Sequence, residues 1–199
     1  MIKYHGMEFQ SCEKVYETAE DTFMLADNLI IKKTDKILEI GTGTGIIAII
    51  ASKICDDVTA IDINKYAVEC AQKNAEINHA HIDIKLGDLY DTVDGEKFDL
   101  ILFNIPYLPT HEKEMVNDEL EAAWDGGKDG RAVINRFIKQ LKNHLNPNGR
   151  VQLVQSSLSN VEETIGILME MGFEVTVTAS ERFFFEEVVV LTGVLTELS

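Results

Sequence analysis

The order of apolar and polar residues along the chain predicts an alternation of helices and strands. Short apolar or alternating runs are typical of strands, and five such runs cover residues 36–40, 57–62, 82–86, 98–103 and 151–155. Apolar residues at helical spacing predict helices, and these cover residues 22–31, 46–54, 64–78, 131–145 and 161–171. Strands that alternate with helices form a parallel sheet with helices on both faces.

The ends of the predicted helices carry capping and stop signals. Asp21 or Thr22 is expected to cap the first helix, and Asn64 is expected to cap the third. The run Asn146-Pro147-Asn148-Gly149 should stop the helix that precedes it.

The C-terminal part predicts two further strands, over residues 173–180 and 184–195, joined by a short charged bend. Strands joined by so short a bend pair antiparallel. We therefore expect a single α/β domain over residues 1–199. It should contain a Rossmann-like sheet of seven strands, mostly parallel, with a C-terminal antiparallel hairpin and helices on both faces. Residues 1–35 are expected to form an N-terminal helical segment.

One long stretch, residues 107–130, has no helical or strand periodicity and contains three glycines. Irregular stretches of this length are uncommon inside compact domains and often serve a function. We expect it to be a loop that covers the substrate.

Charge and composition narrow the class of protein. Acidic residues outnumber basic ones by 34 to 18, a formal net charge of −16, and no dense cluster of Lys and Arg compensates. Such a chain repels nucleic-acid phosphates. No apolar run reaches the roughly 18 residues that cross a bilayer, and the N-terminus lacks the apolar core of a signal peptide. We expect a cytoplasmic protein without direct contact with nucleic acid or membrane.

Cys12, Cys55 and Cys70 should be reduced packing residues, and no metal site is expected.

A glycine turn follows the first predicted strand. The segment Glu39-Ile-Gly-Thr-Gly-Thr-Gly45 runs from a strand into a helix, where glycines allow a tight turn and a close approach of a ligand to the backbone. Ligands of open parallel sheets bind at such strand ends. The spacing of Gly41, Gly43 and Gly45 differs from a dinucleotide fingerprint, since position 46 is Ile. It resembles motif I of S-adenosylmethionine-dependent methyltransferases.

Two more carboxylates end neighbouring strands and predict an adenosine site. Asp62 can accept hydrogen bonds from both ribose hydroxyls; the alternative is that it only caps the next helix. Asp88 can accept from the adenine amino group while Leu89 contacts the ring. Together with Glu39, these acids suit an ammonium, two hydroxyls and an amine better than a pyrophosphate. This favours S-adenosylmethionine as the cofactor.

The fourth strand ends in Asn104-Ile105-Pro106-Tyr107, which resembles the N-P-P-Y motif of methyltransferases that act on planar nitrogens. The oxygen Oδ1 of Asn104 and the carbonyl of Ile105 can accept both N–H bonds of an amide and hold its nitrogen toward the methyl group. Tyr107 can stack on the planar substrate, and Pro106 stiffens the turn. Ile105 departs from the motif, where proline is usual. The alternative is a turn without chemistry.

Two longer segments resemble the eukaryotic and archaeal HemK-like release factor glutamine methyltransferases. They are Val15-Tyr-Glu-Thr-Ala-Glu-Asp-Thr-Phe-Met-Leu25, in which Thr18 replaces a usual proline, and Ala123-Trp-Asp-Gly-Gly-Lys-Asp-Gly-Arg131. The resemblance implies that Thr22 and Asn104 contact the cofactor and that Trp124 belongs to the substrate site. It implies a glutamine acceptor, in the Gly-Gly-Gln motif of a class I release factor.

The same resemblance implies a partner, a small zinc-binding activator protein that forms a heterodimer by pairing along the sheet edge near Ile82–Leu86. An uncovered edge strand is a liability, although a short solvated edge is the alternative.

Three other functions remain open: methylation of an adenine or guanine amino group, methylation of a protein lysine, and a non-catalytic cofactor-binding subunit. An enzyme that extracts a base usually adds a basic domain, for which this chain has neither spare length nor spare positive charge.

Overall fold

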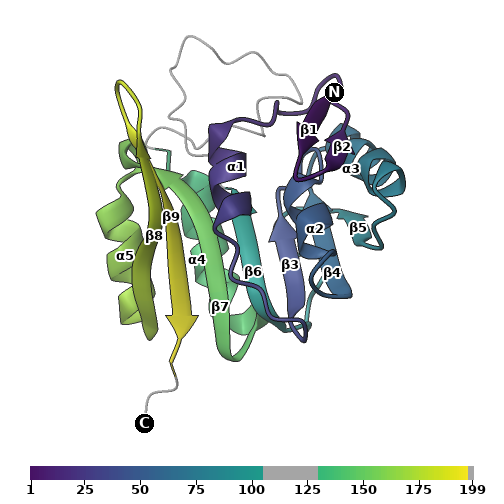
Figure 1. Cartoon of the computed structure of the whole chain (residues 1–199). Coiled ribbons are helices and arrows are strands. Elements are labelled where there is room, and N and C mark those ends of the chain that lie inside the picture. Colours follow the sequence, from purple (N-terminus) through teal and green to yellow (C-terminus); the bar gives the residue numbers. More distant parts are fainter. Residues whose placement is uncertain (105–129, 197–199) are drawn as a thin grey trace.

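The computed structural model describes residues 1–104 and 130–196, which include one seven-stranded sheet (Figure 1). Its strands are β3 (Lys36–Ile40), β4 (Asp57–Asp62), β5 (Asp83–Leu86), β6 (Phe98–Asn104), β7 (Leu145–Ser156), β8 (Phe173–Arg182) and β9 (Glu187–Leu195). They lie in the order β5-β4-β3-β6-β7-β9-β8. Strands β3 to β7 are parallel, and β9 pairs antiparallel with β7 and β8. The expected Rossmann-like fold with a C-terminal hairpin is confirmed.

Helices cover both faces of the sheet. They are α1 (Glu20–Asp27), α2 (Ile46–Ala51), α3 (Lys65–Ile77), α4 (Ala132–Leu141) and α5 (Val161–Glu170). Alternate residues of a strand point to opposite faces, so Leu100 packs with α1 and α2, whereas Ile101 packs with α4 and α5. The layering therefore follows from the apolar runs of the strands, which are buried on both sides. Within the described residues, no helix combines the length and apolar character needed to cross a membrane.

The N-terminal segment differs from the expectation of helix over residues 1–35. Only α1 is helical there, while β1 (Ile2–Tyr4) and β2 (Met7–Phe9) form a separate antiparallel pair. His5 and Gly6 between them both have positive φ, the geometry of a two-residue hairpin turn. The expectation missed the alternation of apolar residues from Ile2 to Phe9, which buries Phe9 against the sheet.

Helix boundaries also differ from the predictions. The N-cap of α1 is Ala19, so Asp21 and Thr22 lie inside the helix and their side chains serve other contacts. Helix α4 ends at Leu141, and the Asn146–Gly149 run belongs to β7. Of the long irregular stretch, residues 107–129 lie outside the described residues, and only Gly130 is described.

The cysteines were expected to be reduced, and this is wrong for two of them. Cys12, in the segment between β2 and α1, forms a disulfide with Cys70 of α3, 58 positions later. Cys55 is buried and free. Their spacing in the sequence could not reveal this pair, because folding lays the N-terminal segment across α3.

Candidate active site

The carboxyl ends of β4, β3 and β6 lie side by side at one edge of the sheet. The chain runs from β3 to β4 and β5 on one side and from β6 to β7 on the other, so the strand order reverses between β3 and β6. Ile40 at the end of β3 pairs with Ile61 and with Phe103. This register places the residues that follow the three strands at the same height along the strand direction. Open α/β sheets bind ligands at this edge.

The glycine turn after β3 is shaped by close packing. Gly41 has φ +69°, and a Cβ there would lie 3.1 Å from the ring of Phe103. Gly45 has φ +83°, and a Cβ there would lie 3.0 Å from the Cβ of Ala71 in α3. Both positions therefore require glycine. A Cβ at Gly43 would meet no described atom within 4 Å, so the turn is open on that side.

Asp62 holds this turn through its carboxylate. Its oxygens accept hydrogen bonds from the backbone N–H of Gly43 (2.8 Å) and of Asn64 (2.9 Å). Burial raises the pKa of Asp62, and the backbone hydrogen bonds oppose that rise. The side chain that caps α3 belongs to Asn64, which accepts from the N–H of Tyr66. Asp62 therefore does not cap the helix, and that alternative for this residue is wrong.

Glu39 holds the same turn from the interior. It is buried and accepts hydrogen bonds from the hydroxyl of Thr42 (2.7 Å) and the N–H of Ala48 (3.0 Å). Burial raises the pKa of Glu39 to about 8, although these hydrogen bonds lower it. Burial therefore favours the protonated form of this side chain. Its predicted contact with the cofactor stays a prediction.

Asp88 and Leu89 follow β5, beside the end of β4. One oxygen of Asp88 lies 2.5 Å from a guanidinium nitrogen of Arg136 in α4. Leu89 is buried against the core with φ +51°. No local pattern indicated that a residue of α4 reaches Asp88, because 48 positions separate the pair.

Asn104 ends β6 with an unusual pattern of contacts. Its side-chain nitrogen donates to the carboxylate of Asp21 and to the hydroxyl of Thr22, both at 3.2 Å. A carboxylate can only accept, so the nitrogen must face Asp21, and the oxygen Oδ1 points the other way. That oxygen is buried and has no hydrogen-bond partner among the described residues. A buried orphan acceptor costs free energy unless a ligand supplies a donor.

The structure thus brings Thr22 and Asn104 into contact and joins Glu39 and Asp62 through the glycine turn. Ile105, Pro106, Tyr107 and Trp124 lie outside the described residues. Sequence reasoning missed the role of Asp21, although it stands next to Thr22 in the segment that carries the family resemblance. Burial of Asp21 is visible only in the structure, so its place next to Thr22 was the signal that the sequence offered.

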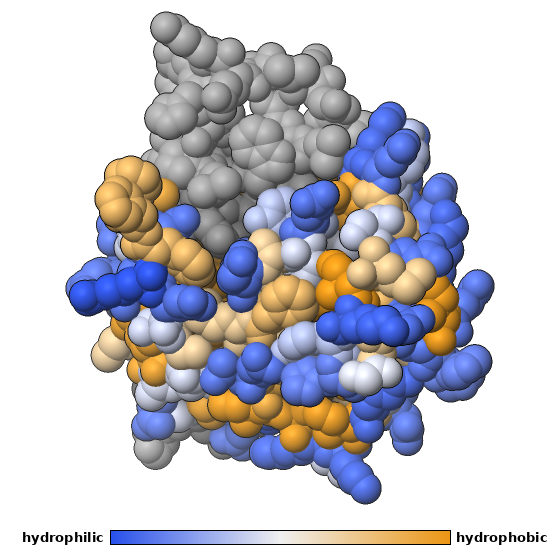
Figure 2. Space-filling model, turned by 45° about the horizontal axis from the view of Figure 1, so that its top comes forward, coloured by the Kyte–Doolittle hydropathy of each residue, from blue (hydrophilic) through white to orange (hydrophobic). Residues whose placement is uncertain are grey.

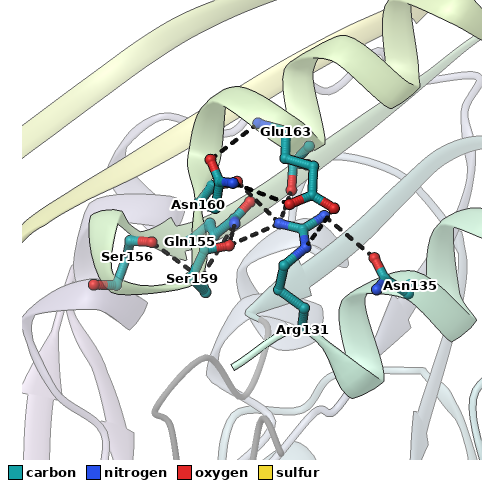
Figure 3. A network of polar contacts seen from close by, with 8 residues as sticks. Arg131, Asn135, Gln155, Ser156, Ser159, Asn160 and Glu163 are labelled. Atoms are coloured by element: carbon teal, nitrogen blue, oxygen red, sulfur yellow. Dashed lines mark hydrogen bonds and ion pairs between the residues drawn. The ribbon is translucent and has the colours of Figure 1, made fainter. Parts of the chain in front are cut away.

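Arg131 is a second residue whose role was missed (Figure 3). It is buried, and its guanidinium donates to the carbonyls of Ser159 (2.7 Å) and Asn160 (2.9 Å) and pairs with Glu163. Gln155 at the end of β7 also donates to the Ser159 carbonyl. Arg131 therefore joins the start of α4 to the turn Ser157–Ser159 and to the start of α5.

Comparison with known proteins identifies the family of this chain. Residues 14–185 match the methyltransferase small domain family. A candidate protein N5-glutamine methyltransferase of Methanocaldococcus jannaschii is 45% identical over 194 residues, covering 97% of this chain and 98% of the relative. The human methyltransferase HEMK2 is 36% identical over 182 residues, covering 84% of each chain. The chain belongs to the HEMK2-like family of protein N5-glutamine methyltransferases.

This methyltransferase also resembles a solved structure, the Mtq2–Trm112 complex of E. cuniculi, which is responsible for methylation of the translation termination factor eRF1. The TM-score is 0.74 at 25% identity, covering 92% of this chain and 99% of the other. The expected family, fold and enzyme class are confirmed. Membership implies that the methyltransferase uses S-adenosylmethionine.

Proposed function

We propose that this methyltransferase transfers a methyl group from S-adenosylmethionine to the side-chain amide nitrogen of a glutamine, the Gln of a Gly-Gly-Gln motif in a class I release factor. The observation that carries the proposal is the orphan oxygen of Asn104. It is a preformed acceptor at the carboxyl end of a strand, its orientation fixed by Asp21 and Thr22.

An amide nitrogen is a weak nucleophile because its lone pair is delocalised into the carbonyl. Asn104 Oδ1 accepts one N–H of the substrate amide and orients the nitrogen, and orientation of this kind lowers a barrier by several kcal/mol. The second acceptor predicted from the sequence, the carbonyl of Ile105, lies outside the described residues. S-adenosylmethionine, when bound, supplies an electrophilic methyl group on a sulfonium.

The residues at the strand ends fit this cofactor. The turn is open beside Gly43, and Asp62 reaches the same turn with its carboxylate. In the proposal Asp62 accepts from the ribose hydroxyls, while Asp88 accepts from the adenine amine and Leu89 lines the ring. The remaining contacts are assigned to Thr22, Glu39, Gly41, Gly43, Gly45 and Asn104.

The activator partner is proposed to bind along β5. Among the described strands, β5 pairs only with β4, and its other edge pairs with none of them. Leu86 on this strand is exposed, and Ile84 is half-buried. The related Mtq2 was solved in complex with Trm112, which supports a heterodimer here. Strand addition to an open edge supplies main-chain hydrogen bonds.

The test is incubation of the methyltransferase, with and without the activator, with labelled S-adenosylmethionine and either a class I release factor or tRNA. Label is expected in the release factor, at its Gly-Gly-Gln glutamine, and not in tRNA. Asn104→Ala should abolish transfer while leaving cofactor affinity within a few-fold. Label in tRNA alone, or wild-type turnover by Asn104→Ala, would overturn the proposal.

A further inference from the structure

The turn between β8 and β9 carries two highly exposed aromatic side chains. Phe184 is 92% exposed and Phe185 is 84% exposed, and their rings form an edge-to-face pair with centroids 4.7 Å apart. The N–H of Phe183 donates to the carbonyl of Glu186 (2.8 Å), which closes the turn. A Phe side chain left in water forgoes the favourable free energy of burying its ring. A protruding apolar pair of this kind marks a contact site.

This aromatic tip, Phe184 and Phe185, lies at the edge of the sheet that holds Asn104. Asn104 pairs with Val154 of β7, and Val154 pairs with Val190 of β9, which leads up to the tip. Two strand spacings across the sheet separate Asn104 from β9, and five extended residues along β9 lead from Val190 to the tip. Together these displacements put the tip roughly 20 Å from Asn104. Figure 1 shows the hairpin rising at the carboxyl-end edge, and Figure 2 shows pale orange side chains projecting at the same side. About six extended residues span that distance.

The base of the hairpin is fixed by hydrogen bonds. Glu186 accepts from the hydroxyl of Ser156, and the N–H of Glu187 donates to the hydroxyl of Ser157 (3.0 Å). Ser159 in the same turn is held by Arg131 and by Gln155 (Figure 3). The aromatic tip therefore projects from a well-anchored base, which lowers the ordering cost of binding.

The surroundings of the tip are acidic. The pKa of Tyr16 is raised to about 12 by burial and by the negative charges of Asp21, Glu186 and Glu20. The tip is flanked by Glu181, Glu186 and Glu187 and by Arg182, which pairs with Glu187, so a net negative field surrounds the tip. Together with the net charge of −16, this field favours a basic polypeptide over nucleic acid.

We propose that the aromatic tip is a docking site for the polypeptide that carries the acceptor glutamine, and that it binds a basic, partly apolar region of that substrate outside the acceptor motif. This inference rests on the proposed function. Aromatic side chains, Phe among them, are enriched in the cores of protein interfaces, and β9, which leads to the tip, is joined through β7 to the strand that holds Asn104.

The test compares the wild type with F184S/F185S, in the presence of the activator. For an intact class I release factor, KM should rise roughly tenfold or more, because two aromatic anchors are lost, while kcat is unchanged. For a peptide of about seven residues centred on Gly-Gly-Gln, too short to reach the tip, KM and kcat should be unchanged. The matched control is Met169→Ser, which removes a 60% exposed apolar side chain from α5 and should change neither KM.

Other results would overturn the inference in recognisable ways. Equal KM values for wild type and F184S/F185S on the intact release factor would show that the tip does not contact the substrate. A wild type that dimerises in sedimentation velocity, with F184S/F185S monomeric, would assign the tip to a second copy of the chain. Failure of the wild type to label the release factor would remove the proposed function, and the inference with it. Unchanged thermal unfolding of F184S/F185S, expected for such exposed residues, excludes misfolding.

Discussion

The side-chain nitrogen of Asn104 lies 3.2 Å from the carboxylate of Asp21, a residue 83 positions earlier in the chain. This contact decides which way the carboxamide faces, because a carboxylate accepts hydrogen bonds only from the nitrogen. The oxygen Oδ1 is thereby left as a buried acceptor without a partner among the described residues. Asp21 is thus a positioning residue, which acts on the substrate through Asn104.

Replacing Asp21 should reduce the rate of transfer more than binding. In Asp21→Ala the carboxamide of Asn104 is free to turn over, so we expect kcat to fall by about 10-fold to 100-fold. The cofactor dissociation constant should stay within a few-fold. Asp21→Asn, which keeps an acceptor oxygen, should retain more activity than Asp21→Ala. The control is Glu20→Ala, which changes the exposed neighbour. Equal kcat for Asp21→Ala and wild type would contradict the positioning role.

Replacing Asp62 should weaken the binding of S-adenosylmethionine. The loss of hydrogen bonds to a charged group is expected to cost about 1.5–3 kcal/mol in Asp62→Ala, measured as the dissociation constant by calorimetry. Asp57→Ala changes an exposed carboxylate at the opposite end of the same strand and should leave the constant unchanged. If Asp62→Ala binds as tightly as wild type, the ribose assignment fails.

Glu39 should make stability depend on pH. Its pKa rises from 4.5 to about 8 on folding because burial disfavours the carboxylate. The folded protein therefore keeps a proton that the unfolded chain releases, so this contribution to stability is complete below about pH 4.5 and is lost as pH rises toward about 8. Glu39→Gln cannot titrate and keeps an acceptor oxygen. The Tm of Glu39→Gln relative to that of the wild type should therefore rise between about pH 4.5 and pH 8 and level off above that range; parallel Tm profiles would refute this.

The disulfide should stabilise the fold. Closing a loop between Cys12 and Cys70, 58 positions apart, restricts the unfolded chain, and such bridges contribute about 2–4 kcal/mol. Cys70→Ser should lower the free energy of unfolding by this amount in denaturant titrations. A reducing agent should lower the stability of the wild type to a similar value and leave Cys70→Ser unaffected. A wild type indifferent to reductant would show that the bridge contributes nothing.

The sequence by itself determined the sheet and the edge of the sheet at which most of the candidate site residues lie. The strands were readable because apolar runs such as residues 98–103 encode burial on both faces locally, along the chain. The antiparallel hairpin followed from the short bend predicted between residues 180 and 184, although the structure places the turn between Arg182 and Glu187. Since carboxyl ends of parallel strands meet at one edge, the order of the elements along the chain was enough to place Asp62 and Asn104 at the same edge of the sheet; their joint role in one site stays a prediction. The N-terminal hairpin was missed because its strands are only three residues long.

Only the tertiary structure decided which side chains meet across that edge. The contacts of Asp21 with Asn104, Arg136 with Asp88 and Cys12 with Cys70 each join residues 48 or more positions apart. No local periodicity encodes such pairs, because they arise when separate elements pack on one sheet. The exposure of Phe184 and Phe185 was equally hidden: the predicted strand over residues 184–195 included both, whereas β9 begins at Glu187, because apolar residues that lead into a strand are typical of core. Periodicity reports how a segment is buried, whereas the partners of a side chain depend on where the other elements are placed.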